Sequence, residues 1–454
     1  MIDVTRQLAA FAVSAPPEAF PPQVRHEAKR AFVNWVGCAL GGSDHPSTNI
    51  ALATADAFSG PRHASVLGRT TRLDALNAAL LNAMSSSVHT FDDTHLTSIT
   101  HPTSPVAAAA MAVAEHRASS GAEFLHAIVL GYEVMARVSN GLTQPPAQYN
   151  LGLYMTGICG GIGAAVAAGR LLGLNEQQMV WAVGIAAAQA AGLREMHGTM
   201  CSGFVPAQAA RGGVLAAHLA ARDFQSAERG LEGPKGLLHV FATAADPAIV
   251  VAGLGRRFEL LANTYKAYPC GIAIHPAIDA CLKLALSHRP DPDQIEAVEL
   301  RLHPLGLALT GRQAPSNGLD AQVSVYHWAA ASLVHRAAGL KEGSDACVQD
   351  PAVIALRERI TAVCRDDIPP DGAVVVLRLR TGQVYESRIE HCQGSSAKPL
   401  DDCALDDKFR AQAEPLLGAG RADSLLRMCW TMDRLEQAGA VASAAAAGSG
   451  SPVA

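Results

Sequence analysis

Apolar residues recur at helical spacing through the first 264 residues of the chain, and this pattern restricts the fold more than any other feature. Residues 23–40 are an example, because their apolar side chains fall on one helix face: Val24, Ala28, Ala31, Phe32 and Trp35. Alanine and glycine are abundant, whereas only 5% of the residues are aromatic. Small side chains suit packed helices better than a β-sandwich. We therefore expect residues 1–264 to form an all-α domain, with further helices after Asp74, after Pro105 and at 121–140, 157–172, 176–193 and 205–222.

The pattern changes near Lys266. Residues 296–302 alternate apolar and charged side chains, as a half-buried strand does. Residues 374–380 and 384–389 lie on either side of a glycine-containing turn, which predicts a hairpin. We expect helices around these strands in three segments: 276–287, 321–338 and 351–364. The region 265–396 is therefore predicted to be a smaller α+β domain.

The C-terminal part returns to the helical pattern. Residues 397–438 contain two such segments, 405–417 and 422–437, which we expect to pack on the first domain. Residues 439–454 are mostly alanine, glycine and serine and have little to bury. This tail is predicted to be disordered.

Charge and cysteine content exclude several classes of protein. The net charge of −5 and the lack of a concentrated basic face argue against nucleic acid or an anionic membrane as partner. The ten cysteines form no CxxC pair, which favours reduced thiols. The N-terminus lacks a basic segment followed by an apolar run, so no signal peptide is expected. The longest apolar windows, 157–169 and 179–193, fall short of the roughly 18–20 residues that span a bilayer. We expect a cytoplasmic protein.

Ionisable side chains concentrate between residues 89 and 101. The segment contains His89, Thr90, Asp92, Asp93, Thr94, His95 and His101. Burying so many ionisable groups is costly unless they are paired or used, so the segment predicts an active-site loop. The adjacent aspartates point in different directions, and we expect only one to reach the site. Ser104 as N-cap and Pro105 predict a helix start whose free N–H groups would hold a substrate carboxylate beside His101.

A second cluster, YKAYPCGIAIH at 265–275, lies at the expected domain junction, where ligand clefts are common. We interpret Lys266 as an anion holder and His275 as an acid/base, with structural roles as the alternative. A metal site built from His89, one of the aspartates, His95 and His101 is a weaker alternative, because the HxH, HxxxH and HExxH spacings are absent. We expect no metal and no organic cofactor.

Several segments together resemble the MmgE/PrpD family, which includes 2-methylcitrate dehydratase, cis-aconitate decarboxylase and iminodisuccinate epimerase. The resemblance covers about residues 5–436 and rests on FDDTH with the following HPTSPV, TGICGGIGAAVAAGRLLGL, GTM with AARGGVLAA, YKAYPCGIAIHPAIDA and KPLDDCALDDKF. It implies a mainly α fold, with a helical domain built from both chain ends, an inserted α+β lid domain, and a homodimer. It also implies a small di- or tricarboxylate substrate, bound in a cleft between the domains without a metal or organic cofactor.

The resemblance extends to single positions. His101, Thr94 and His275 match residues that the family uses in its site, and Lys266 and Asp93 fall in matching segments. Family polar residues are replaced elsewhere: an aspartate by Thr90, a histidine by Tyr154, a lysine by Ser202 and a histidine by Val205. We expect His197 and Arg194 to restore some of the lost positive charge.

These observations predict an enzyme that moves a proton at a carbon next to a carboxylate. Elimination of water is the leading outcome, and epimerisation or decarboxylation are alternatives. The expected catalytic residues are His101, His275 and Asp93, with the two imidazoles meeting over one anion-lined cavity. The expected substrate-binding residues are Thr94, Lys266, His95, Tyr154, His197 and Ser202. A non-catalytic carboxylate-binding protein is the rival interpretation, motivated by the replaced polar positions.

Overall fold

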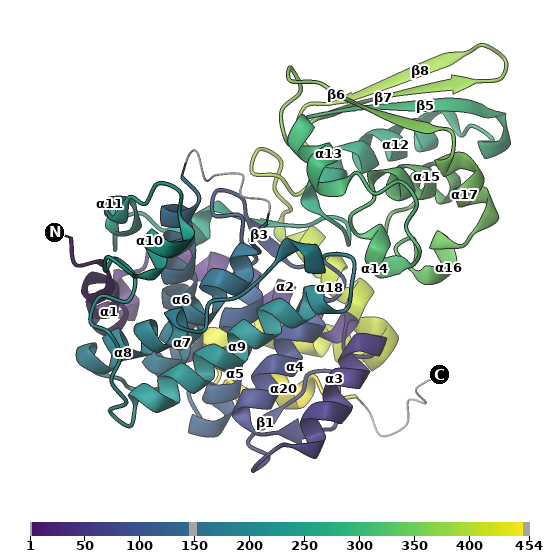
Figure 1. Cartoon of the computed structure of the whole chain (residues 1–454). Helices are drawn as coiled ribbons and strands as arrows, with labels where there is room; N and C mark the ends of the chain where they lie inside the picture. Colours follow the sequence, from purple (N-terminus) through teal and green to yellow (C-terminus); the bar gives the residue numbers. More distant parts are fainter. Residues whose placement is uncertain (1, 145–151, 448–454) are drawn as a thin grey trace.

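The computed structural model describes residues 2–144 and 152–447 of the 454-residue chain (Figure 1). The fold is mainly helical with small sheets, as the sequence predicts. Figure 1 shows a large helical body and, joined to it, a smaller body in which a sheet lies over helices. We call the smaller body the lid; its elements run from the 3₁₀ turn η5 (Ile272–Ile274) to β8 (Val384–Ile389).

The helical body uses both ends of the chain. Its helices are α1 (Val4–Ser14), α2 (Pro22–Gly41), α3 (Pro46–Ala57), α4 (Ala75–Ser87), α5 (Thr103–Arg117), α6 (Gly121–Leu142), α7 (Met155–Leu172), α8 (Glu176–Ala187), α9 (Cys201–Ala220), α10 (Leu237–Phe241), α11 (Pro247–Val251), α18 (Asp402–Leu417), α19 (Ala419–Trp430) and α20 (Gly439–Ala444). Buried side chains from residues 4–260 and from residues 409–445 form one hydrophobic cluster. The C-terminal helices therefore complete the core that the N-terminal part begins.

Local sequence signals account for several of these helices. The Asp74 carboxylate accepts two backbone N–H hydrogen bonds and so caps α4. Ser120 and Glu123 form a capping box at the start of α6. The glycines of α7 let α6 approach closely, since a Cβ on Gly163 would lie 2.7 Å from the carbonyl oxygen of Gly131. The glycine-rich segment thus serves helix packing.

Two predicted helices differ in extent from those observed. Helix α7 is longer than its predicted apolar window, and its length and composition would allow it to cross a membrane, although most of it is buried inside the protein. Among the described residues it is the one helix of this kind. Helix α8 ends at Ala187, six residues before the predicted end. The segment that follows α8 instead contributes Arg194 and His197 to the cavity described below.

The lid contains a four-stranded sheet with the order β6-β5-β7-β8. Strand β5 (Ile295–Leu302) pairs antiparallel with β7 (Ala373–Leu379), and β7 pairs antiparallel with β8, which confirms the predicted hairpin. Strand β6 (Ile360–Cys364) pairs parallel with β5. The lid helices are α12 (His275–His288), α13 (Pro304–Thr310), α14 (Gly318–Ala321), α15 (Val325–His335), α16 (Asp345–Val348) and α17 (Pro351–Arg357). The sheet and helices share a second hydrophobic cluster.

Three predictions of secondary structure are wrong. The helix predicted over 351–364 ends at Arg357, and residues 360–364 form β6, in keeping with their β-branched side chains. The first 264 residues are not all-α. Strand β1 (Ala64–Ser65) pairs with β2 (Arg72–Leu73), and β3 (Asp93–His95) pairs with β4 (Asn263–Tyr265). The helix predicted over 321–338 is shorter, because a separate turn, α14, precedes α15.

The prediction for the C-terminal tail is also wrong in part. Residues 439–454 were expected to be disordered, but residues 439–444 form α20, in which Val441 and Ala442 are buried. The backbone N–H of Gly68 donates a hydrogen bond to the carbonyl oxygen of Ala445 at 3.1 Å. Small side chains that bury little area by themselves still fill a groove on the helical body. Residues 448–454 lie outside the described part of the chain.

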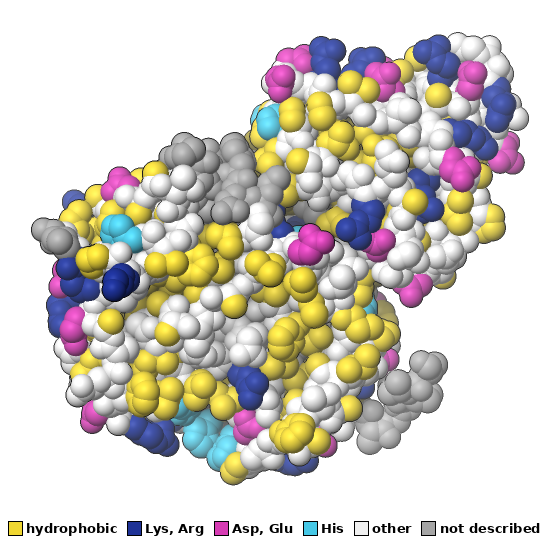
Figure 2. All heavy atoms as spheres, in the orientation of Figure 1, with side chains coloured by type: hydrophobic (Ala, Val, Ile, Leu, Met, Phe, Trp, Pro, Cys, Tyr) yellow, Lys and Arg dark blue, Asp and Glu magenta, His cyan; other side chains and the backbone are white. Residues whose placement is uncertain are grey.

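Figure 2 shows charged side chains of both signs scattered over the visible face, and hydrophobic side chains gathered where α9 runs. Four large apolar side chains on or just before α9 are exposed: Leu193, Met200, Phe204 and Leu215. An apolar face of this kind is a common sign of a protein–protein contact.

Candidate active site

A two-stranded ribbon brings distant parts of the chain together. In the β3–β4 pair, Thr94 lies opposite Thr264, and the Thr264 hydroxyl donates a hydrogen bond to the Thr94 carbonyl at 2.6 Å. The register places Asp92, just before β3, beside Lys266, just after β4. The two residues are 174 positions apart in sequence. Successive side chains of a strand point to opposite faces, so Asp92 and Thr94 face one way and Asp93 the other.

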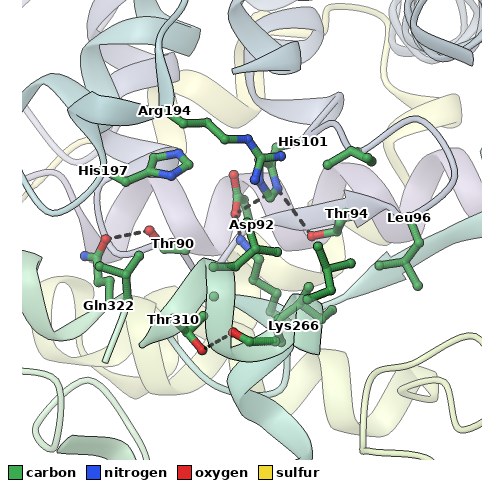
Figure 3. A pocket seen from close by; sticks show the side chains of 18 of the residues that line it. Thr90, Asp92, Thr94, Leu96, His101, Arg194, His197, Lys266, Thr310 and Gln322 are labelled. Carbon is green, nitrogen blue, oxygen red and sulfur yellow. Dashed lines mark hydrogen bonds and ion pairs between the residues drawn. The ribbon is translucent and has the colours of Figure 1, made fainter. Parts of the chain in front are cut away.

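Asp92, Lys266 and His101 form the polar centre of a cavity between the two bodies (Figure 3). The Lys266 Nζ atom lies 2.5 Å from Oδ1 of Asp92, and Nδ1 of His101 lies 3.6 Å from the same oxygen. Burial alone would raise the pKa of Asp92, but the neighbouring charges of His101 and Lys266 bring it below its ordinary value. Asp92 is therefore an ionised carboxylate at neutral pH.

The His101 ring is held in one orientation. Its Nδ1–H donates to the Asp93 carbonyl oxygen at 2.8 Å, because a carbonyl can only accept, and its backbone N–H donates to the Thr156 hydroxyl at 2.9 Å. Nε2 has no hydrogen-bond partner among the described residues. Burial lowers the pKa of His101 to about 4. The imidazole is therefore neutral at pH 7, with a free lone pair on Nε2 that can take a proton.

Asp93 lies in a different environment from Asp92, and its prediction as a catalytic residue is wrong for this arrangement. It is fully buried and does not line the cavity, and its Oδ2 accepts a 2.5 Å hydrogen bond from the Thr103 hydroxyl. Burial raises the pKa of Asp93 to about 6. The carboxylate at the cavity belongs to Asp92, whereas the sequence interpretation chose Asp93 for catalysis.

The first turn of α5 also differs from its prediction. The helix begins at Thr103, and Ser104 is not its N-cap. The Ser104 hydroxyl instead donates to the Ala83 carbonyl at 3.0 Å and contacts the Ser87 hydroxyl at 2.7 Å. The Thr103 hydroxyl, in this turn, donates a hydrogen bond to the Asp93 carboxylate.

Four further predicted residues line the cavity: Thr94, Tyr154, His197 and Ser202. The Thr94 hydroxyl lies 3.3 Å from Nδ1 of His101, and the Tyr154 ring centroid lies 4.7 Å from that of His197. Burial, followed by the charge of Arg194, lowers the pKa of His197 to about 3. Arg194 itself lines the cavity, and Figure 3 shows its side chain extending over His101.

Two predicted residues do not reach the cavity wall. His95 is fully buried, with Nδ1 at 2.8 Å from the Ser98 hydroxyl and Nε2 at 3.5 Å from a Glu259 oxygen. His275 is also fully buried, and its ring packs edge-on against Tyr268 with centroids 5.1 Å apart. In this arrangement the two predicted imidazoles do not meet over the cavity.

The sequence interpretation missed a contact that joins the two bodies at the cavity. The Thr90 hydroxyl donates to the amide oxygen of Gln322 at 2.6 Å, and the Gln322 amide donates to the Val88 carbonyl at 2.8 Å. Thr90 and Gln322 both line the cavity. Thr90 belongs to the predicted active-site loop, but the sequence gives it no partner, and nothing in the sequence marks Gln322 within its predicted helix.

The cavity has a volume of about 490 Å³ and draws its walls from both bodies. Its lining includes one lysine, Lys266, and one arginine, Arg194, which supply positive charge. Within residues 2–144 and 152–447, no group of three or more His, Cys, Asp or Glu side chains is arranged to hold a metal ion.

Two family models match most of the sequence. The MmgE/PrpD N-terminal domain matches residues 6–250, and the MmgE/PrpD C-terminal domain matches residues 268–433. The chain belongs to the MmgE/PrpD family. It is 27% identical to the cis-aconitate decarboxylase-like protein oryM of Aspergillus oryzae, over 92% of each chain. It is 26% identical to a cis-aconitate decarboxylase of Aspergillus terreus, over 95% of this chain and 94% of that one. It is 23% identical to the human cis-aconitate decarboxylase, over 91% of this chain and 88% of that one.

These relatives are named as lyases, so the comparisons favour an enzyme over a non-catalytic binding protein. Three of the four positions that the resemblance marks as replaced lie at the cavity. Thr90, Tyr154 and Ser202 all line it, whereas Val205 does not. The cavity of this MmgE/PrpD protein therefore combines a centre of His101, Asp92 and Lys266 with the polar side chains of Thr90, Tyr154 and Ser202.

Proposed function

We propose that this protein is a cofactor-independent lyase that acts on a small di- or tricarboxylate by proton transfer at a carbon next to a carboxylate. The observation that carries the proposal is the free Nε2 of His101 beside the Asp92–Lys266 pair, in a cavity between the two bodies. Decarboxylation of cis-aconitate or a related acid is the leading reaction, because the curated relatives named above carry this activity in their names.

In the proposed reaction, Lys266 and Arg194 hold substrate carboxylates, and the Thr94 hydroxyl adds a hydrogen bond. Loss of CO₂ leaves the electron pair of the broken C–C bond in the carbon framework, so a proton must be delivered to carbon. His101 delivers that proton from Nε2. Bound substrate carboxylates raise the pKa of the imidazole and so supply the protonated form that this step needs.

Dehydration is the second candidate, and the neutral form of His101 favours it. A neutral imidazole with a free Nε2 is ready to abstract a proton, which is the first step in eliminating water from a 2-hydroxy acid such as 2-methylcitrate. Epimerisation needs a second acid/base on the opposite face of the carbon. His275 was predicted for that place, and a role for it requires a rearrangement that brings its ring to the cavity.

The test is incubation of the protein with cis-aconitate and, separately, 2-methylcitrate in D₂O. Released CO₂ measures decarboxylation, and NMR measures loss of water and deuterium bound to carbon. We expect CO₂ with deuterium at one carbon. His101→Ala should abolish both signals while the thermal unfolding midpoint stays within a few degrees. His239→Ala, at an exposed position on α10 that does not line the cavity, should behave as the unchanged protein. Binding of the acids without any reaction would support the non-catalytic alternative.

A separate substitution tests the proposed role of His275. Among the described residues, neither of its buried ring nitrogens has a hydrogen-bond partner of normal geometry, which is costly unless they serve a function. We expect His275→Met to raise the thermal unfolding midpoint and to leave kcat nearly unchanged, because the ring does not line the cavity. A fall in kcat of about 100-fold would instead show that the ring reaches the substrate during turnover.

We also propose that the protein is a homodimer in which the exposed apolar face of α9 meets a second copy. Phe204 and Leu215 are exposed on this helix. Light scattering after size exclusion is expected to give twice the chain mass. Phe204→Glu should yield the monomer, and a dimer that is unaffected by this change would place the contact elsewhere.

A further inference from the structure

The cavity has two chemically different sides. The side next to His101 is polar, whereas another part of the wall consists of apolar side chains: Leu96, Ile99, Ile272, Ala273, Leu305, Leu309, Val323 and Pro370. The polar side alone would provide the contacts that a compact carboxylate needs. The apolar wall therefore needs a separate explanation.

The helical body contributes Leu96 and Ile99 from the short loop between β3 and His101. Leu96 is 38% exposed, and Ile99 has a φ of +55°, a backbone conformation that β-branched residues rarely adopt. Figure 3 shows the Leu96 side chain on the side of Thr94, away from His197. The loop holds two apolar side chains at the cavity in spite of backbone strain, which is typical of residues that contact a ligand.

This loop is fixed in place by hydrogen bonds at its base. His95 and Thr100 exchange two backbone hydrogen bonds, at 2.9 and 3.3 Å. The Ser139 hydroxyl of α6 donates to the Ser98 carbonyl at 2.7 Å, and Ser98 is fully buried. The exposure of Leu96 thus belongs to a well-anchored loop.

The lid contributes the other part of the apolar wall. Leu305 and Leu309 are four residues apart on α13, so both project from one helix face. The Thr310 hydroxyl donates to the Gly306 carbonyl at 2.7 Å, within the same helix, and offers no donor to the cavity. Ile272 of η5 extends this apolar surface.

Charge and volume agree with this division. The lining cations, Lys266 and Arg194, are matched by two lining carboxylates, Asp92 and Asp371, so the wall has little excess positive charge for a compact trianion. The volume of about 490 Å³ falls within the range of about 300–1,000 Å³ that drug-sized ligands occupy. A six-carbon acid would leave much of the apolar wall in contact with water.

We propose that the substrate is a di- or tricarboxylate that carries an apolar substituent, an alkyl chain or an aromatic ring, on its carbon skeleton. Its carboxylates lie against Lys266 and Arg194, and the substituent lies between the loop of residues 96–99 and helix α13. This inference rests on the proposed function, and it names the substrate class of the same site.

The first experiment compares kcat/KM for the parent acid with its methyl, butyl and hexyl derivatives. Each methylene buried against the apolar wall should raise kcat/KM about fourfold until the wall is covered. Leu309→Ser should lower the ratio of kcat/KM for the hexyl derivative to that for the parent acid by at least fivefold. Leu286→Ser is the matched control, because Leu286 is exposed on α12 and does not line the cavity, and it should leave the ratio unchanged.

A second experiment measures binding without turnover. It therefore tests the apolar subsite even if the protein converts none of the acids. By calorimetry, hexylsuccinate should bind at least tenfold more tightly than succinate, and Leu309→Ser should remove most of this difference. Equal affinities, or a difference that Leu309→Ser leaves intact, would overturn the inference. A parent acid converted as fast as its alkyl derivatives would overturn it as well while leaving the proposed lyase activity in place.

Discussion

At the scale of single residues, the two adjacent aspartates have different tasks. Asp92 is ionised between Lys266 and His101 at the cavity, whereas Asp93 is buried against Thr103. We expect Asp92→Asn to lower kcat/KM by about 100-fold or more, because the pair that positions Lys266 is lost. Asp93→Asn should lower it less than tenfold, since an amide oxygen still accepts from Thr103. Steady-state kinetics on both variants checks this, and the opposite ranking would return the catalytic role to Asp93.

The raised pKa of Asp93, about 6, also predicts a pH dependence of stability. Its pKa in the unfolded chain is about 3.9, so between these values the folded protein binds more protons than the unfolded chain. The stability that protonated Asp93 provides is full below about pH 4 and is lost as pH rises through about 6. The stability of the unchanged protein relative to Asp93→Asn should therefore fall by up to about 3 kcal/mol across this window and stay level above it. Urea unfolding at pH 4.5, 5.5, 6.5 and 7.5 measures this difference; a flat difference would contradict the shift.

At the scale of elements, α18 supports the site from the far end of the chain. The buried Lys408 Nζ donates to the carbonyl oxygens of Phe91 and Lys266, at 2.7 and 2.9 Å, and so joins the two segments that carry Asp92 and Lys266. Lys408→Met removes both hydrogen bonds. The Phe91 carbonyl keeps the hydrogen bond from the Cys38 thiol, whereas the Lys266 carbonyl loses the Lys408 donor, at a cost of about 1–3 kcal/mol. We expect a lower unfolding midpoint together with lower kcat/KM. Lys398→Met, at an exposed position, is the control and should change neither; a Lys408 variant with normal stability would show that water replaces the ammonium group.

The elements also show what the sequence can reveal. Helices such as α4 and α6 are predictable because their caps and apolar spacing are local signals. The β3–β4 ribbon is not, because its pairing joins residues 170 positions apart, and neither strand exceeds three residues. The side to which each aspartate points depends on that pairing. The cluster of residues 89–101 therefore predicted the site, but not that Asp92 lies at the cavity and His95 away from it.

At the scale of the whole molecule, the cavity exists only while the lid is docked on the helical body. Lid residues were harder to assign than body residues for this reason. Gln322 lies in a segment predicted only as a helix, and no element was predicted for Leu305 and Leu309. The part of all three in the cavity comes from the docking of the two bodies. His275 shows the converse, since its match to the family's site did not bring its ring to the cavity wall.

The contact of Gln322 with Thr90 and Val88 links lid and body at the cavity. Gln322→Ala removes two hydrogen bonds, each worth about 1 kcal/mol, and each body keeps its own hydrophobic core. The unfolding midpoint should change little. Substrate binding must then supply the free energy of docking the lid on the body that Gln322 no longer provides. KM should therefore rise about five- to thirtyfold, with a smaller change in kcat. Gln349→Ala, which removes a hydrogen bond to Ser316 within the lid, should leave KM unchanged. If Gln322→Ala also left KM unchanged, the two bodies would be held together by their remaining contacts, and Gln322 would have no part in positioning the substrate.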